Sequence, residues 1–238
     1  MRFLPATCLA LSALSPSFSA AESKLPIVVE LFTSQGCSSC PPADAMFHDL
    51  ARMDGVIALA LHVDYWDYIG WPDSFASPDH TARQEAYARA NGERMVYTPQ
   101  IIVGGQDRVV GGDAIAVMEK LHAYANETTP VDLSIARDGD RLVIEAPPLP
   151  LARPLEVQVV RYTPEDEVVI TGGENAGLTM AYSNIVTSWD AVGTWTGAEP
   201  LRLELTLEGT EPVVVLLQEP GPGRIRAAAK LGPDGESD

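Results

Sequence analysis

Two cysteines separated by two serines and followed by two prolines constrain the fold of this chain more than any other feature. The motif Cys37-Ser38-Ser39-Cys40 follows the apolar run 27–32, which has the length and composition of a buried parallel strand. Pro41 and Pro42 suit the first turn of a helix, because the N–H group that proline lacks would have no intrahelical partner there. We therefore expect the cysteines to lie between a strand and the start of a helix.

The spacing of the cysteines favours chemistry over bracing. A disulfide stabilises a fold mainly by closing a long loop, and two intervening residues close almost none. The sequence contains three cysteines, and the third, Cys8, lies in an N-terminal segment that we expect to be removed. Cys37 and Cys40 would then be the only thiols, which favours a redox centre.

The N-terminal residues 1–21 have the three-part pattern of an export signal. Arg2 gives a positive start, residues 3–14 are apolar, and Ser19-Ala20-Ala21 has the small residues of a signal-peptidase site. An apolar N-terminal strand or helix is the alternative. The apolar run is too short for a permanent anchor, and no later segment has the length of a membrane span. We expect an exported protein, periplasmic or secreted from a bacterium, with no membrane span.

The charge balance argues against one large class of partner. The formal net charge is −17 at pH 7, whereas nucleic-acid binding needs a footprint of lysine and arginine on the phosphates. We therefore expect no nucleic-acid partner, and we attribute the acidic surface to solubility.

The first half of the chain alternates between strand and helix patterns. The expected strands are 27–32, 56–63, 100–103 and 108–110, and the expected helices are 40–53, 81–91 and 113–125. The short turn between the last two strands indicates an antiparallel hairpin. The predicted order is therefore β-α-β-α-β-β-α.

The second half has short strand patterns without helices, which is typical of a small β-sandwich. The predicted strands are 131–136, 142–145, 155–162, 168–171, 201–207, 213–217 and 224–228. Gly172-Gly173-Glu174-Asn175 is expected to be a turn, and we find no catalytic constellation in this half. The predicted parts are a signal peptide 1–21, an α/β domain 22–128, a sandwich-like all-β domain 129–231 and a disordered tail 232–238.

The positions of the two cysteines predict their roles. A thiol attacks a disulfide only as the thiolate, and a helix N-terminus favours that anion. Cys37, exposed at the first turn, is the expected nucleophile. Cys40, one turn later and better shielded, is expected to resolve a mixed disulfide formed on Cys37.

Several motifs together resemble the thioredoxin superfamily, whose β-α-β-α-β-β-α order matches the predicted one. The motifs are Val29-Glu30-Leu31-Phe32, Cys37-Ser38-Ser39-Cys40-Pro41 and Tyr97-Thr98-Pro99. More narrowly, the sequence resembles a family of secreted bacterial thioredoxin-like proteins catalogued as a domain of unknown function. The stretches that carry this narrower resemblance are 30–37, 62–67, 82–84 and 173–175.

The superfamily resemblance implies three further site residues. Pro99 stands where thioredoxins carry a cis-proline that faces the disulfide, so Thr98 would face the substrate and pair with an extended peptide. Glu30 stands near the buried carboxylate that accepts the proton of the resolving thiol. Burial would raise its pKa and suit it to that role; a carboxylate in solvent at the strand edge is the alternative.

An aromatic-rich insert, residues 62–75, follows the second strand. Tyr65 and Trp66 belong to it, and the carboxyl ends of parallel strands are where sites form. One interpretation is a lid that recognises substrate near Cys37, with Tyr65 and Trp66 as substrate-binding residues. The other is a packed loop whose aromatics cover the sheet edge. His62, at the end of a strand pattern, is expected to be a satisfied core histidine.

Three functions remain open from the sequence. The leading hypothesis is an exported thiol–disulfide oxidoreductase that acts on protein or peptide thiols and disulfides with a redox partner protein and no cofactor. The alternatives are a Cu(I)-handling protein that uses the same two thiolates, and a binding module without electron transfer. His48, His62, His80 and His122 lack metal-ligand spacing, so no metal site is predicted from them. The sequence predicts neither the direction of electron flow nor the oligomeric state.

Overall fold

A computed structural model describes residues 23–232. The predicted signal peptide, including Cys8, and nearly all of the predicted tail lie outside the described residues. Within the described chain, no helix combines the length and the hydrophobicity that a membrane span requires.

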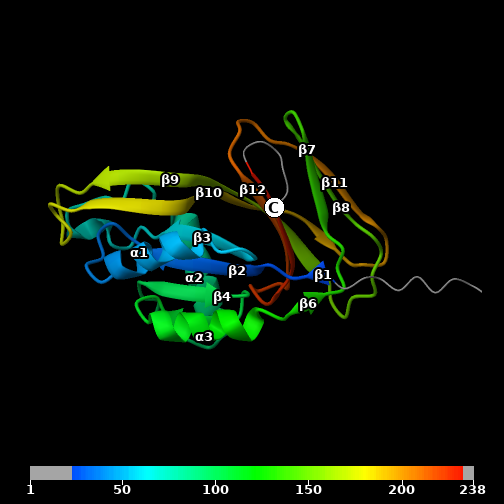
Figure 1. Ribbon diagram of the computed structural model, residues 1–238, viewed down its shortest axis with the longest axis horizontal. Coiled ribbons are helices and arrows are strands. Elements are labelled where there is room, and N and C mark those ends of the chain that lie inside the picture. The colour runs from blue at the N-terminus through cyan, green and yellow to red at the C-terminus, as the bar shows by residue number, and fades with distance from the viewer. Residues whose placement is uncertain (1–22, 233–238) are drawn as a thin grey trace, which may run out of the picture.

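The fold is a mixed α/β structure built on one large sheet (Figure 1). Its eight strands run in the order β13-β12-β9-β10-β3-β2-β4-β5. In sequence order they are β2 (Ile27–Thr33), β3 (Val56–His62), β4 (Gln100–Val103), β5 (Asp107–Val110), β9 (Leu155–Val169), β10 (Thr179–Trp195), β12 (Val213–Gln218) and β13 (Ile225–Leu231). β2 and β3 are parallel, whereas β4 pairs antiparallel with both β2 and β5.

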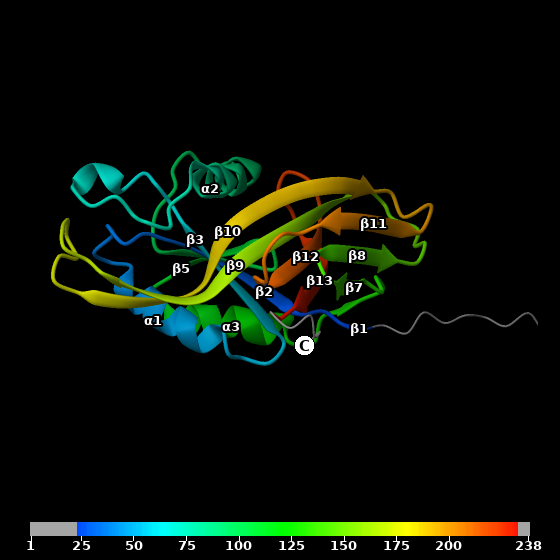
Figure 2. The same ribbon diagram turned by 90° about the horizontal axis from the view of Figure 1, so that it is seen from above.

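Three helices cover the first half of this sheet, as predicted. They are α1 (Pro41–Leu50), α2 (Pro78–Ala90) and α3 (Ala114–Tyr124), with a short 3-10 turn η1 (Asp67–Ile69) in the insert. Side chains alternate along β2: Val29 and Leu31 pack with α1 and α3, whereas Val28 and Phe32 pack with Tyr87 of α2. Figure 2 shows α2 on one side of the sheet and α1 with α3 on the other.

A second, small sheet has the order β11-β8-β7 and covers the far half of the large one. Its strands are β7 (Ser134–Asp138), β8 (Arg141–Ala146) and β11 (Leu201–Thr206), and the two-residue strands β1 (Ser23–Lys24) and β6 (Thr128–Thr129) pair with each other. Leu142 and Ile144 of β8 form a third core with Val157 of β9 and Val215 of β12.

The predicted separate sandwich domain is therefore wrong in one important respect. β10 pairs in parallel with β3 through Ile185 and Ala60, so the second half continues the sheet of the first. The sequence prediction missed β10 and divided β9, because the distal part of this long ribbon is largely exposed and its residues lack an apolar pattern. The tip of the β9–β10 hairpin lies near α1, at the end of the molecule opposite the small sheet (Figure 1).

Candidate functional site

The loop between β2 and α1 carries a disulfide between Cys37 and Cys40. Cys40 is the N-cap residue of α1, so the helix begins later than predicted and Cys37 precedes it. Pro41 and Pro42 have no N–H groups, and the N–H groups of Ala43 and Asp44 donate to Cys40 O at 2.8 and 3.1 Å. The first-turn donors are thus committed to Cys40 O, and the predicted helix-terminus stabilisation of a Cys37 thiolate is weaker than the sequence suggested.

Both cysteines are buried. Cys37 is 1% exposed and Cys40 0%, so the prediction of an exposed Cys37 is wrong for the disulfide form. The cover comes from segments that the sequence does not link to the motif, namely the insert and the tip of the β9–β10 hairpin.

The Thr98-Pro99 peptide is cis, as the resemblance implied. Ser39 links this peptide to the cysteines: its Oγ lies 3.4 Å from Cys37 Sγ and donates to Thr98 O at 3.4 Å. Trp66 Nε1 donates to Thr98 Oγ1 at 2.7 Å. The structure therefore brings Trp66 and Thr98 together beside the disulfide.

Tyr65 lies one step further out and supports the same segment. Its hydroxyl donates to Gln84 Oε1 at 3.1 Å, and Gln84 Nε2 donates to Tyr97 O at 2.8 Å. Burial raises the pKa of Tyr65 to about 12, so the phenol remains a neutral donor. These contacts brace the chain that leads into Thr98.

The insert also wraps the residues before Cys37. Gln35 N donates to Asp73 Oδ2 at 2.8 Å, and Trp71 Nε1 donates to Gln35 Oε1 at 2.8 Å. A Cβ on Gly36 would lie 3.2 Å from Trp66 Cβ, so Gly36 permits the close approach of the insert. The insert is therefore a packed loop that lies against the cysteine loop, and substrate recognition by Tyr65 and Trp66 stays a prediction.

Asn175, at the hairpin tip, closes the site from the second half of the chain. It is buried, and its Nδ2 donates to Gln35 O at 2.8 Å and to Cys37 O at 3.0 Å. A Cβ on Gly172 would lie 2.8 Å from Gly70 O, so the tip also packs closely on the insert. The sequence predicted a turn here and a resemblance to the narrower family, but not a contact with the cysteine loop.

A group of buried acids and histidines lies among these elements. Asp44 Oδ1 accepts from Thr33 Oγ1 at 2.8 Å, and His62 Nδ1 lies 2.7 Å from Asp73 Oδ2. Asp44, His62 and Asp73 are all buried. Burial raises the pKa of Asp44 to about 7, while His62 and the Thr33 hydrogen bond act in the opposite direction.

Glu30 is buried but does not occupy the place that the resemblance implied. Its carboxylate accepts from Arg83 Nε at 2.6 Å and Nη2 at 2.9 Å, and from the Tyr87 hydroxyl at 2.6 Å. On β2 its side chain shares the face of Val28 and Phe32, towards α2, whereas α1 packs on the other face. Its contacts are thus those of a structural ion pair and not those of a proton acceptor for Cys40.

A family model described as "Protein of unknown function (DUF1223)" matches residues 28–218. The chain belongs to the DUF1223 family. No curated protein matches it.

Two solved structures are similar to this DUF1223 chain. One is the crystal structure of a protein from Agrobacterium tumefaciens whose sequence is 36% identical to this chain. The match covers 90% of this chain and 96% of that protein's chain, with a TM-score of 0.77. The other is HBP35 of Porphyromonas gingivalis, whose sequence is 15% identical to this chain. The match covers 89% of this chain and 76% of the HBP35 chain, with a TM-score of 0.62. At that identity the likeness to HBP35 concerns the fold alone.

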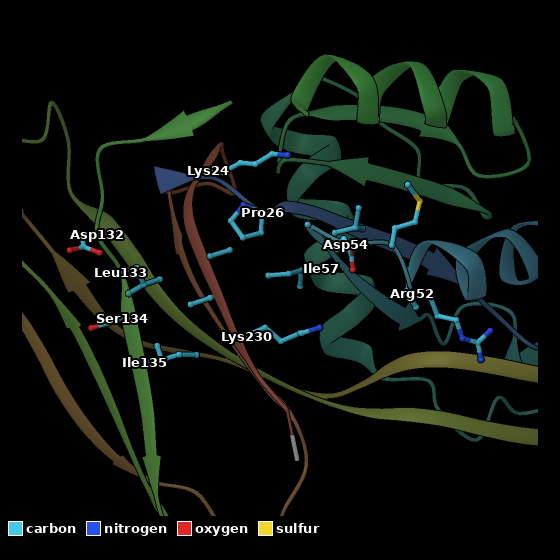
Figure 3. A pocket seen from close by; sticks show the side chains of 16 residues that line it. Lys24, Pro26, Arg52, Asp54, Ile57, Asp132, Leu133, Ser134, Ile135 and Lys230 are labelled. Atoms are coloured by element: carbon cyan, nitrogen blue, oxygen red, sulfur yellow. The ribbon is translucent and has the colours of Figure 1, made fainter. Parts of the chain in front are cut away.

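A sizeable cavity of the DUF1223 chain, of about 960 Å³, lies away from the cysteines (Figure 3). It is bounded by the residues after α1, the start of β7 and strand β13. Its labelled side chains include Lys24, Arg52, Asp54, Asp132 and Lys230. None of the residues that line it belongs to the cysteine loop, the insert or the hairpin tip.

The sequence reading missed Asp44, Asp73 and Asn175. A signal existed for Asp44, because an acidic residue beside Ala43 falls on the apolar face that α1 buries. Within residues 23–232, no group of three or more His, Cys, Asp or Glu side chains has an arrangement that could hold a metal ion.

Proposed function

We propose that this DUF1223 protein is an exported thiol–disulfide oxidoreductase with a thioredoxin-like fold that acts on protein or peptide thiols and disulfides. The observation that carries the proposal is the position of the Cys37–Cys40 disulfide. It follows a parallel strand, precedes a helix, and is linked through Ser39 to the backbone of Thr98. The element order of the first half and the cis Thr98-Pro99 peptide agree with a thioredoxin-like arrangement.

The proposed reaction is a pair of thiol–disulfide exchanges. Cys37 thiolate attacks a substrate disulfide, a Cys37–substrate bond forms, and one substrate sulfur leaves as a thiolate. Cys40 thiolate then attacks Cys37 Sγ, the Cys37–Cys40 disulfide forms, and the second substrate sulfur leaves. The dithiol is oxidised and the substrate disulfide is reduced; the reverse sequence oxidises a substrate dithiol.

Two features of the site support these roles. In the reduced protein the Ser39 hydroxyl, 3.4 Å from Cys37 Sγ, can turn from Thr98 O and donate its one hydrogen bond to the thiolate instead. Thr98 offers its backbone beside the cysteines, where an extended peptide can pair with it. Because Cys37 is almost fully covered, a substrate must first displace the insert or the hairpin tip.

Trapping of the mixed disulfide tests the proposal. A reduced Cys40→Ser variant, mixed with a model peptide disulfide, should accumulate a Cys37–peptide adduct detectable by mass spectrometry, whereas Cys37→Ser should not. The proposal fails if Cys37 titrates near the free-thiol value of about 8.5 and reacts no faster than a small thiol.

A further inference from the structure

Two buried polar atoms close to the cysteine loop have no hydrogen-bond partner. Within residues 23–232, Asp44 Oδ2 and His62 Nε2 are buried and unpaired. Buried polar groups are paired in the large majority of cases, and an exception calls for a physical reason such as catalysis or an internal water. Here the two exceptions belong to neighbouring ionisable groups that interact electrostatically.

The hydrogen bonds fix the proton on one side of His62. Asp73 Oδ2 accepts from Gln35 N at 2.8 Å, and Asp73 Oδ1 accepts from Phe75 N at 2.9 Å. Burial disfavours the charge on Asp73, but His62 and these N–H groups together hold its pKa below the ordinary value. Asp73 is therefore a carboxylate and His62 Nδ1 is the donor in the bond to it, so the unpaired ring atom of His62 is Nε2.

Asp44 is also a sequence neighbour of the resolving cysteine. Asp44 lies one helical turn after Cys40, and its N–H donates to Cys40 O at 3.1 Å. Residues four apart share a face of a helix, and both of these side chains are buried. Thr33 holds Oδ1 of Asp44, so Oδ2 is the oxygen left for a proton.

We propose that Asp44, His62 and Asp73 form a buried proton relay that takes up the proton of Cys40 during the second exchange step. This inference rests on the proposed oxidoreductase function. Asp44 and His62 exchange the proton with Cys40, and Asp73 is a positioning residue that holds His62 in one tautomer.

The Cys40 thiol gives its proton to the Asp44 carboxylate, and the resulting thiolate attacks Cys37 Sγ of the mixed disulfide. The bond between Cys37 and the substrate breaks, and the substrate sulfur leaves with the electron pair. In the disulfide form Asp44 and His62 share no hydrogen bond, so the proton passes on to His62 Nε2 only after the two side chains have moved into contact, and the reverse transfer protonates Cys40 when the disulfide is reduced.

Other groups around the relay do not compete for this proton near neutral pH. From β10, Tyr182 packs on His62 with ring centroids 4.9 Å apart, and burial raises its pKa. From α2, His80 Nδ1 pairs with His62 O at 2.9 Å, and burial lowers its pKa. Thr33 from β2 carries no titratable acid. The remaining groups, Asp44 and His62, are the two with unpaired atoms.

Rapid-quench kinetics with a model peptide disulfide test the relay. The reduced protein should first form the Cys37–peptide adduct and then lose it as Cys40 attacks. Asp44→Asn should slow the loss of the adduct on the order of 10²-fold, which is the lower range for general acid–base catalysis. Adduct formation, measured in the Cys40→Ser background, should remain within about twofold, and Asp49→Asn, at an exposed acid of the same helix, should change neither step.

A second readout does not need catalysis. Carboxyl ¹³C NMR of the oxidised protein should show one aspartate that titrates near neutral pH and that disappears in Asp44→Asn. If Asp44→Asn folds poorly, His62→Gln carries the kinetic test instead and should also slow the second step.

The outcomes separate the two proposals. If folded Asp44→Asn forms the Cys37–peptide adduct and loses it at the wild-type rates, the relay is overturned and the proposed oxidoreductase function is unaffected. An Asp44 carboxylate ionised throughout the range from about pH 5 to about pH 9 also overturns the relay. No adduct in Cys40→Ser overturns the proposed function itself.

Discussion

Two buried carboxylates lie on opposite faces of the same sheet and differ in how many of their oxygens have hydrogen-bond partners. Glu30 has an arginine, a tyrosine and no unpaired oxygen, since Arg83 and Tyr87 satisfy both of its oxygens. Asp44 has one hydroxyl partner and one oxygen with none. A fully satisfied ion pair holds its charge fixed, whereas a half-satisfied acid can gain and lose a proton. The difference agrees with a structural ion pair at Glu30 and with the proton relay proposed for Asp44.

The largest effect should come from breaking the satisfied site. Arg83→Leu leaves the Glu30 charge buried without compensation, which should lower the free energy of unfolding by about 3–5 kcal/mol. Urea denaturation at pH 7 measures this loss. Arg89→Leu is the control, because it removes an exposed pair with Glu85 on the same helix and should cost less than about 1 kcal/mol. Equal losses in the two variants would contradict the assignment of Glu30 as a structural anchor.

The half-satisfied site should appear in the pH dependence of stability. Burial raises the pKa of Asp44 from 3.8 to about 7, so the unfolded chain ionises this acid first as the pH rises. The wild type should therefore lose stability between about pH 4 and about pH 7, by about 1.4 kcal/mol for each pH unit, relative to Asp44→Asn.

Urea denaturation of both proteins at pH 5 and pH 8, in the disulfide form, checks this prediction. The difference isolates Asp44, because the other titratable groups are the same in both chains. Parallel stability curves would show that Asp44 is ionised in the native state like an ordinary surface acid.

A substitution in the cover of the cysteine loop should change the stability of the protein less than a substitution at either acid site. Asn175→Ala removes the side-chain donor to two carbonyl oxygens, of Gln35 and Cys37, although Cys37 O still accepts from Cys40 N, and the change should cost about 1–3 kcal/mol. We expect faster reduction of the disulfide by a phosphine, about tenfold for each 1.4 kcal/mol of cover that is lost. Asn126→Ala, at an exposed turn, is the matched control, and equal reduction rates in both variants would rule out the tip as a cover.

The smallest loss of stability should come from a substitution in the insert, which is the other part of this cover. Trp66→Phe removes the 2.7 Å hydrogen bond to Thr98 Oγ1 but keeps an aromatic ring, so the expected loss is about 0.5–1.5 kcal/mol. Thermal unfolding measures it, with Tyr68→Phe at an exposed position as the control. A loss of stability larger than that of Asn175→Ala would show that the insert contributes more to the cover than the hairpin tip.

The first half of the fold could be predicted because its signals are local. Apolar runs define β2 and β3, two prolines mark the start of α1, and the cis-proline position follows from the resemblance. The continuation of the sheet could not be predicted, since the pairing of Ile185 with Ala60 joins residues far apart in sequence.

The site was predictable to the same extent. Cys37, Cys40, Thr98 and Trp66 follow from motifs and are adjacent in the fold. The role of Glu30 was assigned wrongly, because the face of a strand on which an acid lies depends on which helix packs there. Asn175 lies in a stretch that carries the family resemblance, but its role and that of Asp73 could not be predicted, since each acts through a partner distant in sequence.

The bond between Asn175 and Cys37 also has a temporal consequence. Asn175 lies 138 residues after Cys37, and β10, which carries the returning arm of the hairpin, follows it. As the chain is made from its N-terminus, both thiols emerge long before the hairpin tip that completes their cover. An oxidant can therefore form the disulfide on an open nascent chain, and the hairpin closes over a bond that already exists. Oxidation before enclosure is the order that this topology favours.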